Sequence, residues 1–448
     1  MKLNQTMRAD HTVKKMMMKN LFAFGLAFCM ILPAFSQNID TKKMPERIHT
    51  SFWNYNKFSG FRMEMLHDWV NCGMTLPVSP LFEWKNDSAE DFLQMLDEAE
   101  KLGVQMIIQV DVLFIDNDAE QYRKTATEVY EKFGKHPAVC GVYIGEEPNT
   151  HNDKSFHECT KIFKEIAPEL TVYINLGSPG RMEGAALKGK LSLTEWMRNF
   201  TQFTGSRVIG FGEYDQMIPG GIKMDNYFTS LRESMEAANA SGMELWATLL
   251  SSAHGPFEAP TEDQYRWQLN TAVACGCKAV VWFRLYDKLV ALDYRNSPID
   301  EFGEKTTYYY NLRRVQKRFN IHHGEIFARL QYLDTCFIDT YSLDVCYGGY
   351  KKFEKDSHDL VANAESPHGM ISDFKDSDGN DYIVILNTSQ TIDRPIKLTF
   401  SEKVNSADIL YYNGDMTQNI FRRNGQSGGM TAVEIWLAPG QMELIKIN

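Results

Sequence analysis

Two neighbouring glutamates, Glu146 and Glu147, are the residues of this chain whose types and spacing best fit acid–base chemistry. They stand before Pro148 and Asn149, directly after an apolar run that predicts a strand. A carboxyl group beside a second carboxylate is harder to ionise, so such a pair can offer one protonated acid and one charged partner. The alternative is that each acid caps the following helix or is a solvated loop charge. For two acids at one strand end we favour the catalytic interpretation.

Further polar and aromatic side chains follow the other predicted strands. Besides the Glu146 segment, the candidate site residues are Asp111, Asn175, Glu213, Tyr214, Trp246, Trp282, Arg284 and Tyr286. Strict alternation along residues 278–286 predicts that Trp282, Arg284 and Tyr286 face the ligand, while the residues between them meet helices. Each aromatic side chain could stack on a ring-shaped ligand or belong to the core.

The elements that must position these residues form a repeating pattern between about residues 47 and 331. Short apolar runs alternate with segments of helical periodicity, which predicts successive strand–helix units and a parallel sheet. The predicted strands are residues 48–53, 75–82, 105–111, 139–146, 171–176, 207–213, 244–251 and 278–286. Eight units match a (β/α)8 barrel, a TIM barrel, in which side chains at the carboxyl ends of the strands face the substrate.

An open doubly wound sheet is the alternative architecture. Its dinucleotide site requires a glycine-rich loop after the first strand, but the sequence there is Asn54-Tyr55-Asn56-Lys57. We therefore expect no dinucleotide. No cluster of histidines and cysteines has the spacing of metal ligands, so neither a cofactor nor a metal is expected.

A second domain is predicted over residues 332–448, where the apolar periodicity changes to two. Strand-like segments at 382–387, 396–400, 407–412, 431–437 and 442–447 indicate an antiparallel, β-sandwich-like fold. Residues 376–381 resemble a calcium loop, yet Asp378-Gly379 between two strands favours a hairpin turn. Because no low-complexity linker separates the two parts, we expect the β domain to pack on the barrel.

The composition bounds the partners and the compartment. The formal net charge of −11 disfavours nucleic acid as a partner. Residues 1–36 have basic residues, a short apolar core and a small-x-small site, which predicts a cleaved signal peptide and an exported, periplasmic or extracellular protein. No later stretch predicts a transmembrane segment. We expect most cysteines to be buried apolar residues. The strand pattern suggests one disulfide, between Cys336 and Cys346.

Paired carboxylates and aromatic platforms, with no metal or cofactor motif, are what cleavage of a glycosidic bond requires. One acid protonates the leaving oxygen, and the other stabilises or attacks the anomeric carbon. The expected substrate is therefore an oligo- or polysaccharide.

Several motifs resemble those of known glycosidases. Tyr-Ile-Gly-Glu-Glu-Pro-Asn (residues 143–149) resembles the strand-four motif of the large clan whose (β/α)8 barrels carry Asn-Glu-Pro there. Residues 173–176, 212–214, 227–232 and 437–440 look like family 42-like glycosidases exported by polysaccharide-degrading bacteria, most of them uncharacterised. This resemblance implies that Glu147 is the general acid/base and that Glu146 replaces an asparagine that hydrogen-bonds a sugar 2-hydroxyl.

The chain departs from the clan's pattern in two places. Strict alternation points only one of Glu146 and Glu147 at the barrel axis, unless a bulge lets both reach the site. The charge of Glu146 would raise the pKa of Glu147 and favour its protonated form. In addition, residues 245–251 of the seventh strand contain no acid, although the clan places its nucleophilic glutamate there.

Three explanations for the missing acid follow, in order of preference. Glu213 or Asp215 on the sixth strand could supply the second carboxylate, with Glu213 preferred because it lies nearer the strand. The enzyme could instead invert through a water activated by a carboxylate such as Asp111. Finally, the barrel could bind glycans without cleaving them.

Overall fold

The computed structural model describes residues 46–116, 118–183, 187, 190–221, 223–287, 293–338, 347–423 and 432–448. The predicted signal peptide and Cys346 lie outside these residues. Within the described part, no helix is both long enough and apolar enough to cross a membrane.

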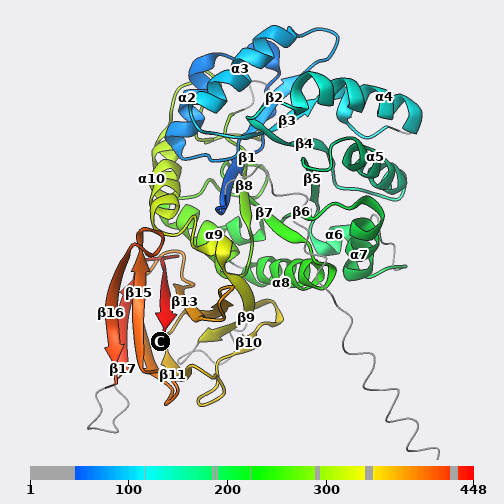
Figure 1. The fold of residues 1–448 in the computed structure, drawn as a ribbon. Coiled ribbons are helices and arrows are strands. Elements are labelled where there is room, and N and C mark those ends of the chain that lie inside the picture. Colours follow the sequence, from blue (N-terminus) through cyan, green and yellow to red (C-terminus); the bar gives the residue numbers. More distant parts are fainter. Residues whose placement is uncertain are drawn as a thin grey trace, which may run out of the picture. The chain divides into compact units, whose positions relative to one another are not determined.

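Residues 49–322 form the predicted (β/α)8 barrel (Figure 1). The parallel strands are β1 (His49–Phe52), β2 (Val78–Phe82), β3 (Met106–Val110), β4 (Val139–Glu146), β5 (Thr171–Leu176), β6 (Val208–Gly212), β7 (Glu244–Leu250) and β8 (Ala279–Phe283). They pair in sequence order, and β8 returns to β1. Between β1 and β2, the amides of Thr75 and Leu76 donate to the Thr50 carbonyl, so backbone hydrogen bonds also join the two ends of the sheet.

One main helix follows each strand and covers the outside of the barrel (Figure 1). These helices are α2 (Met63–Cys72), α3 (Ala89–Lys101), α4 (Ala119–Val129), α5 (Asp153–Ile166), α7 (Leu193–Thr204), α8 (Met224–Ser241), α9 (Glu262–Ala274) and α10 (Thr307–His322). The short α6 (Pro179–Met182) lies between β5 and α7. Local sequence sets where several of them begin: Ser192 and Thr261 each form a capping box, and Asp118 caps α4.

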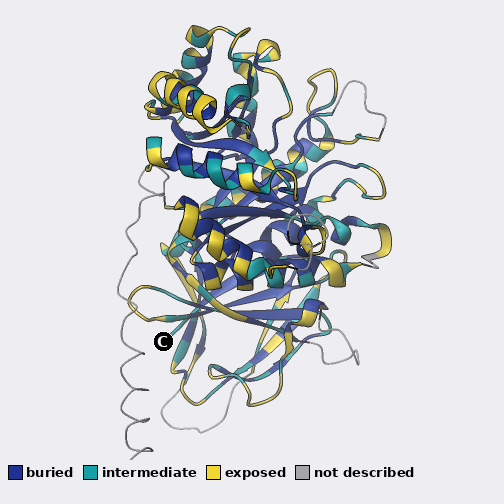
Figure 2. Ribbon diagram, turned by 90° about the vertical axis from the view of Figure 1, so that its right-hand side faces the viewer, coloured by how far each residue is buried: buried dark blue, intermediate teal, exposed yellow. Residues whose placement is uncertain are grey.

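Along each barrel strand, side chains point alternately into the barrel and outward against the helices. The interior cluster includes Trp53, Tyr143, Tyr173 and Trp246, whereas the residues between them join a larger cluster shared with the helices. The barrel strands are therefore largely buried on both faces, whereas the surrounding helices expose their outer faces (Figure 2).

The last part of the chain, from residue 331 onward, forms the predicted antiparallel domain, made of two sheets. The seven-stranded sheet contains β9 (Gln331–Ile338), β10 (Lys351–Lys352), β12 (Gly369–Lys375), β13 (Asp381–Asn387), β15 (Ser406–Tyr411), β16 (Met416–Arg422) and β18 (Met442–Ile447). The three-stranded sheet contains β11 (Val361–Glu365), β14 (Arg394–Phe400) and β17 (Ala432–Leu437). Apolar residues of both sheets meet in one cluster, as in a sandwich.

Two smaller expectations for this domain are confirmed. β12 and β13 pair through a hairpin, and the Asp376 carboxylate accepts hydrogen bonds from the amides of Asp378 and Asn380 within the turn. The domain also packs on the barrel: the Trp267 indole of α9 donates to the Thr388 carbonyl at 2.8 Å, and Asn270 donates to the Gly440 carbonyl.

Candidate active site

A bulge in β4 decides where the two neighbouring glutamates point. Tyr143 pairs with Tyr173 of β5, but Gly145 pairs with Ile174, so Ile144 is an extra residue in the ladder. Gly145 has a φ of 145°, which a residue with a side chain rarely adopts. After the bulge Glu146 pairs with Asn175, an inward position of β5. The bulge therefore turns Glu146 toward the barrel axis.

Glu147 extends over the end of β5 toward the helix that follows. Its amide donates to the Asn175 carbonyl at 2.8 Å, and its backbone has a positive φ of 48°. Its carboxylate accepts a hydrogen bond from Arg181 of α6, with 2.6 Å between Nη1 and Oε1. Both side chains of this ion pair are open to solvent.

The surroundings of Glu146 change the pKa of its carboxyl group. Desolvation by surrounding protein, followed by the negative charge of Glu147, raises the pKa of Glu146 to about 7, against a smaller opposing effect of Arg181. The Glu146 side chain nevertheless remains exposed, so a ligand can reach its carboxyl group. A proton donor near neutral pH requires this combination.

Tyrosines surround the two acids at the mouth of the barrel. The charges of Glu146 and Glu147 both contribute to the raised pKa values of Tyr55, Tyr143 and Tyr214, and burial is the larger cause in each case. Glu146 ends β4 and Glu147 follows it, so both acids stand at the carboxyl end of this strand, near these tyrosines.

Aromatic rings form one wall of this mouth. Tyr214 after β6 stacks on Phe283 of β8 with ring centroids 5.5 Å apart, and Tyr55 after β1 meets the same Phe283 edge-on. His254 after β7 packs on Phe283, and burial lowers its pKa, which favours the neutral imidazole. Tyr55 is 46% exposed, which leaves its ring available to a ligand.

Asn175 lies inside the barrel beside Glu146, as predicted. It is buried, and its side-chain oxygen accepts a hydrogen bond from Thr248 of β7 at 2.8 Å. A Cβ at Gly210 of β6 would lie 3.0 Å from the same oxygen, so the glycine makes room for this polar pair.

Glu213 does not point into the mouth, contrary to its predicted role as the partner carboxylate. Its oxygens accept hydrogen bonds from the amides of Tyr214 and Asp215 and from the hydroxyl of Ser230 on α8. The inward position at this strand end belongs to Gly212, because β6 keeps strict alternation. Glu213 therefore fastens the loop after β6 to α8.

Three other polar candidates also hold loops in place. Asp111 accepts a hydrogen bond from the Trp84 amide and so fastens the loop after β2. Asn149 accepts one from the His151 amide in the turn that leads into α5. Asp215 binds Asn226 at the start of α8. None of these three contacts involves Glu146 or Glu147.

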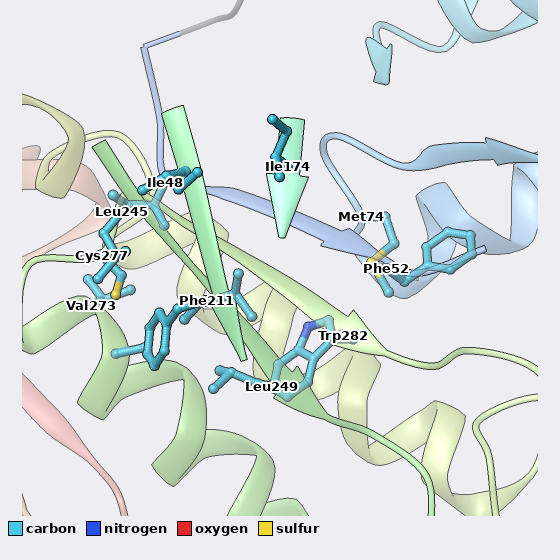
Figure 3. Close-up of a cluster of buried hydrophobic side chains, with 14 of the residues drawn as sticks. Ile48, Phe52, Met74, Ile174, Phe211, Leu245, Leu249, Val273, Cys277 and Trp282 are labelled. Atoms are coloured by element: carbon cyan, nitrogen blue, oxygen red, sulfur yellow. The ribbon is translucent and has the colours of Figure 1, made fainter. Parts of the chain in front are cut away.

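The predicted orientation of the β8 side chains is wrong for Trp282. Its indole lies in the outer cluster and donates to Gln316 of α10 at 3.1 Å (Figure 3). Ala279 and Val281 face inward instead, and Ala279 pairs with Trp246, because the large interior rings leave room only for small neighbours.

Two further aromatic candidates are also removed from the acids. Trp246 faces inward but is buried under Tyr173, with ring centroids 5.2 Å apart, so it belongs to the core. The hydroxyl of Tyr286 accepts a hydrogen bond from the Trp69 indole of α2, which draws its ring toward the helices.

Sequence reasoning missed three residues of the mouth. Strict alternation assigned Phe283 to the helices, and Tyr55 was read only as evidence against a glycine loop. Arg181 carries no local signal, because it reaches Glu147 from the next strand–helix unit. Among the described residues, Asp97, Glu100 and His136 form one group with metal-ligand spacing. His136 precedes the start of β4, whereas Glu146 and Glu147 stand at the end of that strand.

Comparisons with known structures agree with the architecture. The cold-adapted β-galactosidase of Rahnella sp. R3 superposes with a TM-score of 0.51 at 9% identity, over 66% of this chain and 59% of that one. A family 39 glycoside hydrolase from the gut symbiont Bacteroides cellulosilyticus WH2 covers 90% of this chain and 81% of its own, with a TM-score of 0.49 and 10% identity. A glucosidase from Croceicoccus marinus covers 90% and 96%, with a TM-score of 0.46 and 12% identity.

Neither a protein-family model nor a curated protein sequence matches the chain. At 9% identity, the superposition on the β-galactosidase supports the fold alone and leaves the substrate and the mechanism to the site itself.

Proposed function

We propose that the protein is a glycoside hydrolase in which Glu146 donates the proton to the glycosidic oxygen and Glu147 is the ionised partner. One observation carries this proposal. The β4 bulge sets two carboxyl groups at one mouth, where the pKa of Glu146 is raised to about 7 while Arg181 binds Glu147. Two acids whose environments differ in this way suit a division of roles between proton donor and charged carboxylate.

The reaction would begin with a sugar ring against Tyr55. The Glu146 carboxylic acid protonates the leaving oxygen as the bond to the anomeric carbon breaks, and the negative charge of Glu147 stabilises the positive charge that develops on the sugar. Water then adds to the anomeric carbon and returns a proton to Glu146. This assignment moves the role of acid from Glu147, where the resemblance placed it, to its neighbour.

The test uses glycosides with good and poor leaving groups. Aryl glycosides with acidic phenols need little protonation, whereas alkyl glycosides and disaccharides depend on the acid. Glu146→Gln should lower turnover of the second group by at least about a hundredfold and of the first group much less. An equal loss on both groups would exclude Glu146 as the proton donor.

A carbohydrate-binding barrel without turnover is the second candidate. It is favoured because the end of β7, residues 250–254, carries no carboxylate. If no glycoside is cleaved while oligosaccharides still bind, and Tyr55→Ala weakens that binding, the barrel is a binding module.

We also propose that the protein acts outside the cytoplasm, with the barrel over residues 37–331 and the β domain over 332–448. The support is the signal-like sequence of residues 1–36. Cell fractionation with N-terminal sequencing of the mature chain tests it, and a mature protein that begins at Met1 would contradict it.

A further inference from the structure

Arg284, which follows β8, is a buried cation without an anionic partner among the described residues. It is 4% exposed, and its guanidinium lies against the ring of Tyr294 at 4.6 Å and that of Tyr55 at 5.5 Å. Its Nε donates to the Tyr286 carbonyl at 2.6 Å, which leaves both terminal nitrogens free of protein acceptors in this part of the chain. A buried charge in this state is costly unless a ligand neutralises it.

Neither of the two acids whose charges act on Arg284 forms an ion pair with it. The Asp287 carboxylate accepts hydrogen bonds from both the amide and the hydroxyl of Ser297, and Asp293 is exposed. Neither lies within salt-bridge distance of Arg284, although both charges act on it from further away. The N–H groups on the two terminal nitrogens of Arg284 are therefore available to a ligand.

Arg284 lines a cavity of about 390 Å³, and Tyr55, Arg62, Asp300 and Glu301 are among the other residues that line it. The Tyr55 ring lies against the Arg284 guanidinium and is also exposed. A sugar ring that stacks on Tyr55 in this cavity would therefore lie close to the guanidinium. A cavity of this size is within the range of small-molecule sites.

We propose that Arg284 binds the carboxylate of a uronic acid in the substrate, so that the enzyme acts on an acidic glycan. The inference rests on the proposed function for the bond that is cleaved, but not for the binding itself. Two parallel N–H groups match the two oxygens of a planar carboxylate. Asp300 and Glu301 also line the cavity and suit sugar hydroxyl groups better than a second anionic substituent.

The experiment measures binding without turnover. Full-length Glu146→Gln protein is titrated with D-glucuronate, D-galacturonate and the neutral hexoses D-glucose and D-galactose, and with galactose 6-sulfate as a second anion. We expect at least one uronate to bind at least about tenfold more tightly than its neutral hexose, an advantage that decreases with salt. Equal affinity for the uronates and the hexoses would overturn the proposal, and so would preference for the sulfate ester.

Variants locate the effect. Arg284→Gln should abolish the preference for the uronate, Arg284→Lys should restore part of it, and Arg313→Gln should leave it unchanged, because Arg313 lies on the surface of α10. A preference that survives in folded Arg284→Gln protein would contradict the assignment. If Arg284→Gln does not fold, the comparison of uronate with hexose on the parent protein still decides whether an acidic sugar is preferred.

The outcome separates this inference from the proposed function. If uronate binding depends on Arg284 but no glycoside is cleaved, the carboxylate subsite is supported and the proposed hydrolase activity is contradicted. If uronides and neutral glycosides are cleaved at equal rates and Arg284→Gln changes neither rate, the hydrolase activity is supported and the carboxylate subsite is contradicted.

Discussion

A Gly-Glu pair stands at the carboxyl end of both β4 and β6, yet the two glutamates point in opposite directions. A bulge precedes Glu146, the last residue of β4, so that it faces the barrel axis, whereas the unbroken β6 ladder ends at the inward Gly212 and the following Glu213 turns outward. Glu213 then accepts three hydrogen bonds from its own loop and from α8, while the carboxyl group of Glu146 stays exposed with a raised pKa. The one-residue difference in register therefore places one glutamate at the candidate site and leaves the other to hold a loop against α8.

The largest expected effect comes from exchanging each glutamate for its amide. Glu146→Gln should lower turnover on substrates with poor leaving groups by at least about a hundredfold, while Glu213→Gln should change it by less than about threefold. Steady-state kinetics on purified variants provide the measurement. A comparable loss in Glu213→Gln protein of unchanged stability would return the partner role to Glu213.

The two glycines should differ in their tolerance of a methyl group. Gly145→Ala places a Cβ 3.1 Å from the Phe156 ring at a φ of 145°, and we expect a loss of about 1 to 3 kcal/mol in the free energy of unfolding. Gly212→Ala places its Cβ no closer than 3.7 Å to any neighbour and serves as the matched control. Urea titration compares the two variants, and equal losses would show that the bulge does not depend on the glycine.

The charges beside Glu146 should move its titration in opposite directions. Glu147→Gln removes the negative neighbour that raises the pKa of Glu146, so the alkaline limb of activity should shift to lower pH in whatever turnover remains. Arg181→Met removes the guanidinium that lowers this pKa, so the limb should shift to higher pH. Shifts of the same sign would mean that another group controls the limb.

The smallest effect concerns stability. Because the pKa of Glu146 in the folded protein, about 7, lies above its ordinary value, the folded state binds more protons than the unfolded state between the two values. The contribution of Glu146 to stability therefore decreases as pH rises through this interval. Glu146→Gln lacks this dependence, so its melting temperature relative to the parent should increase from pH 5 to pH 8. A constant difference would show that the carboxyl group is not desolvated.

Much of the molecule could be predicted from the sequence, because it depends on local patterns. All eight barrel strands lie within their predicted segments, since apolar runs and helix caps act over a few residues. The β domain and its hairpin follow from period-two patterning and from Asp378-Gly379 in the same way.

Only the tertiary structure decided which side chains meet at the mouth. Strict alternation failed in β4, where the extra residue Ile144 shifts the register. In β8 the side chains alternate, but the opposite set faces inward, because Trp246 leaves room beside it for Ala279 while Trp282 packs outside. The contact between Arg181 and Glu147 depends on the pairing of β4 with β5, because Arg181 belongs to the segment that follows β5. The sequence determined that two acids stand at one strand end; which of them becomes the proton donor depends on ladder register, interior packing and a charge from another unit, and none of these is a local property.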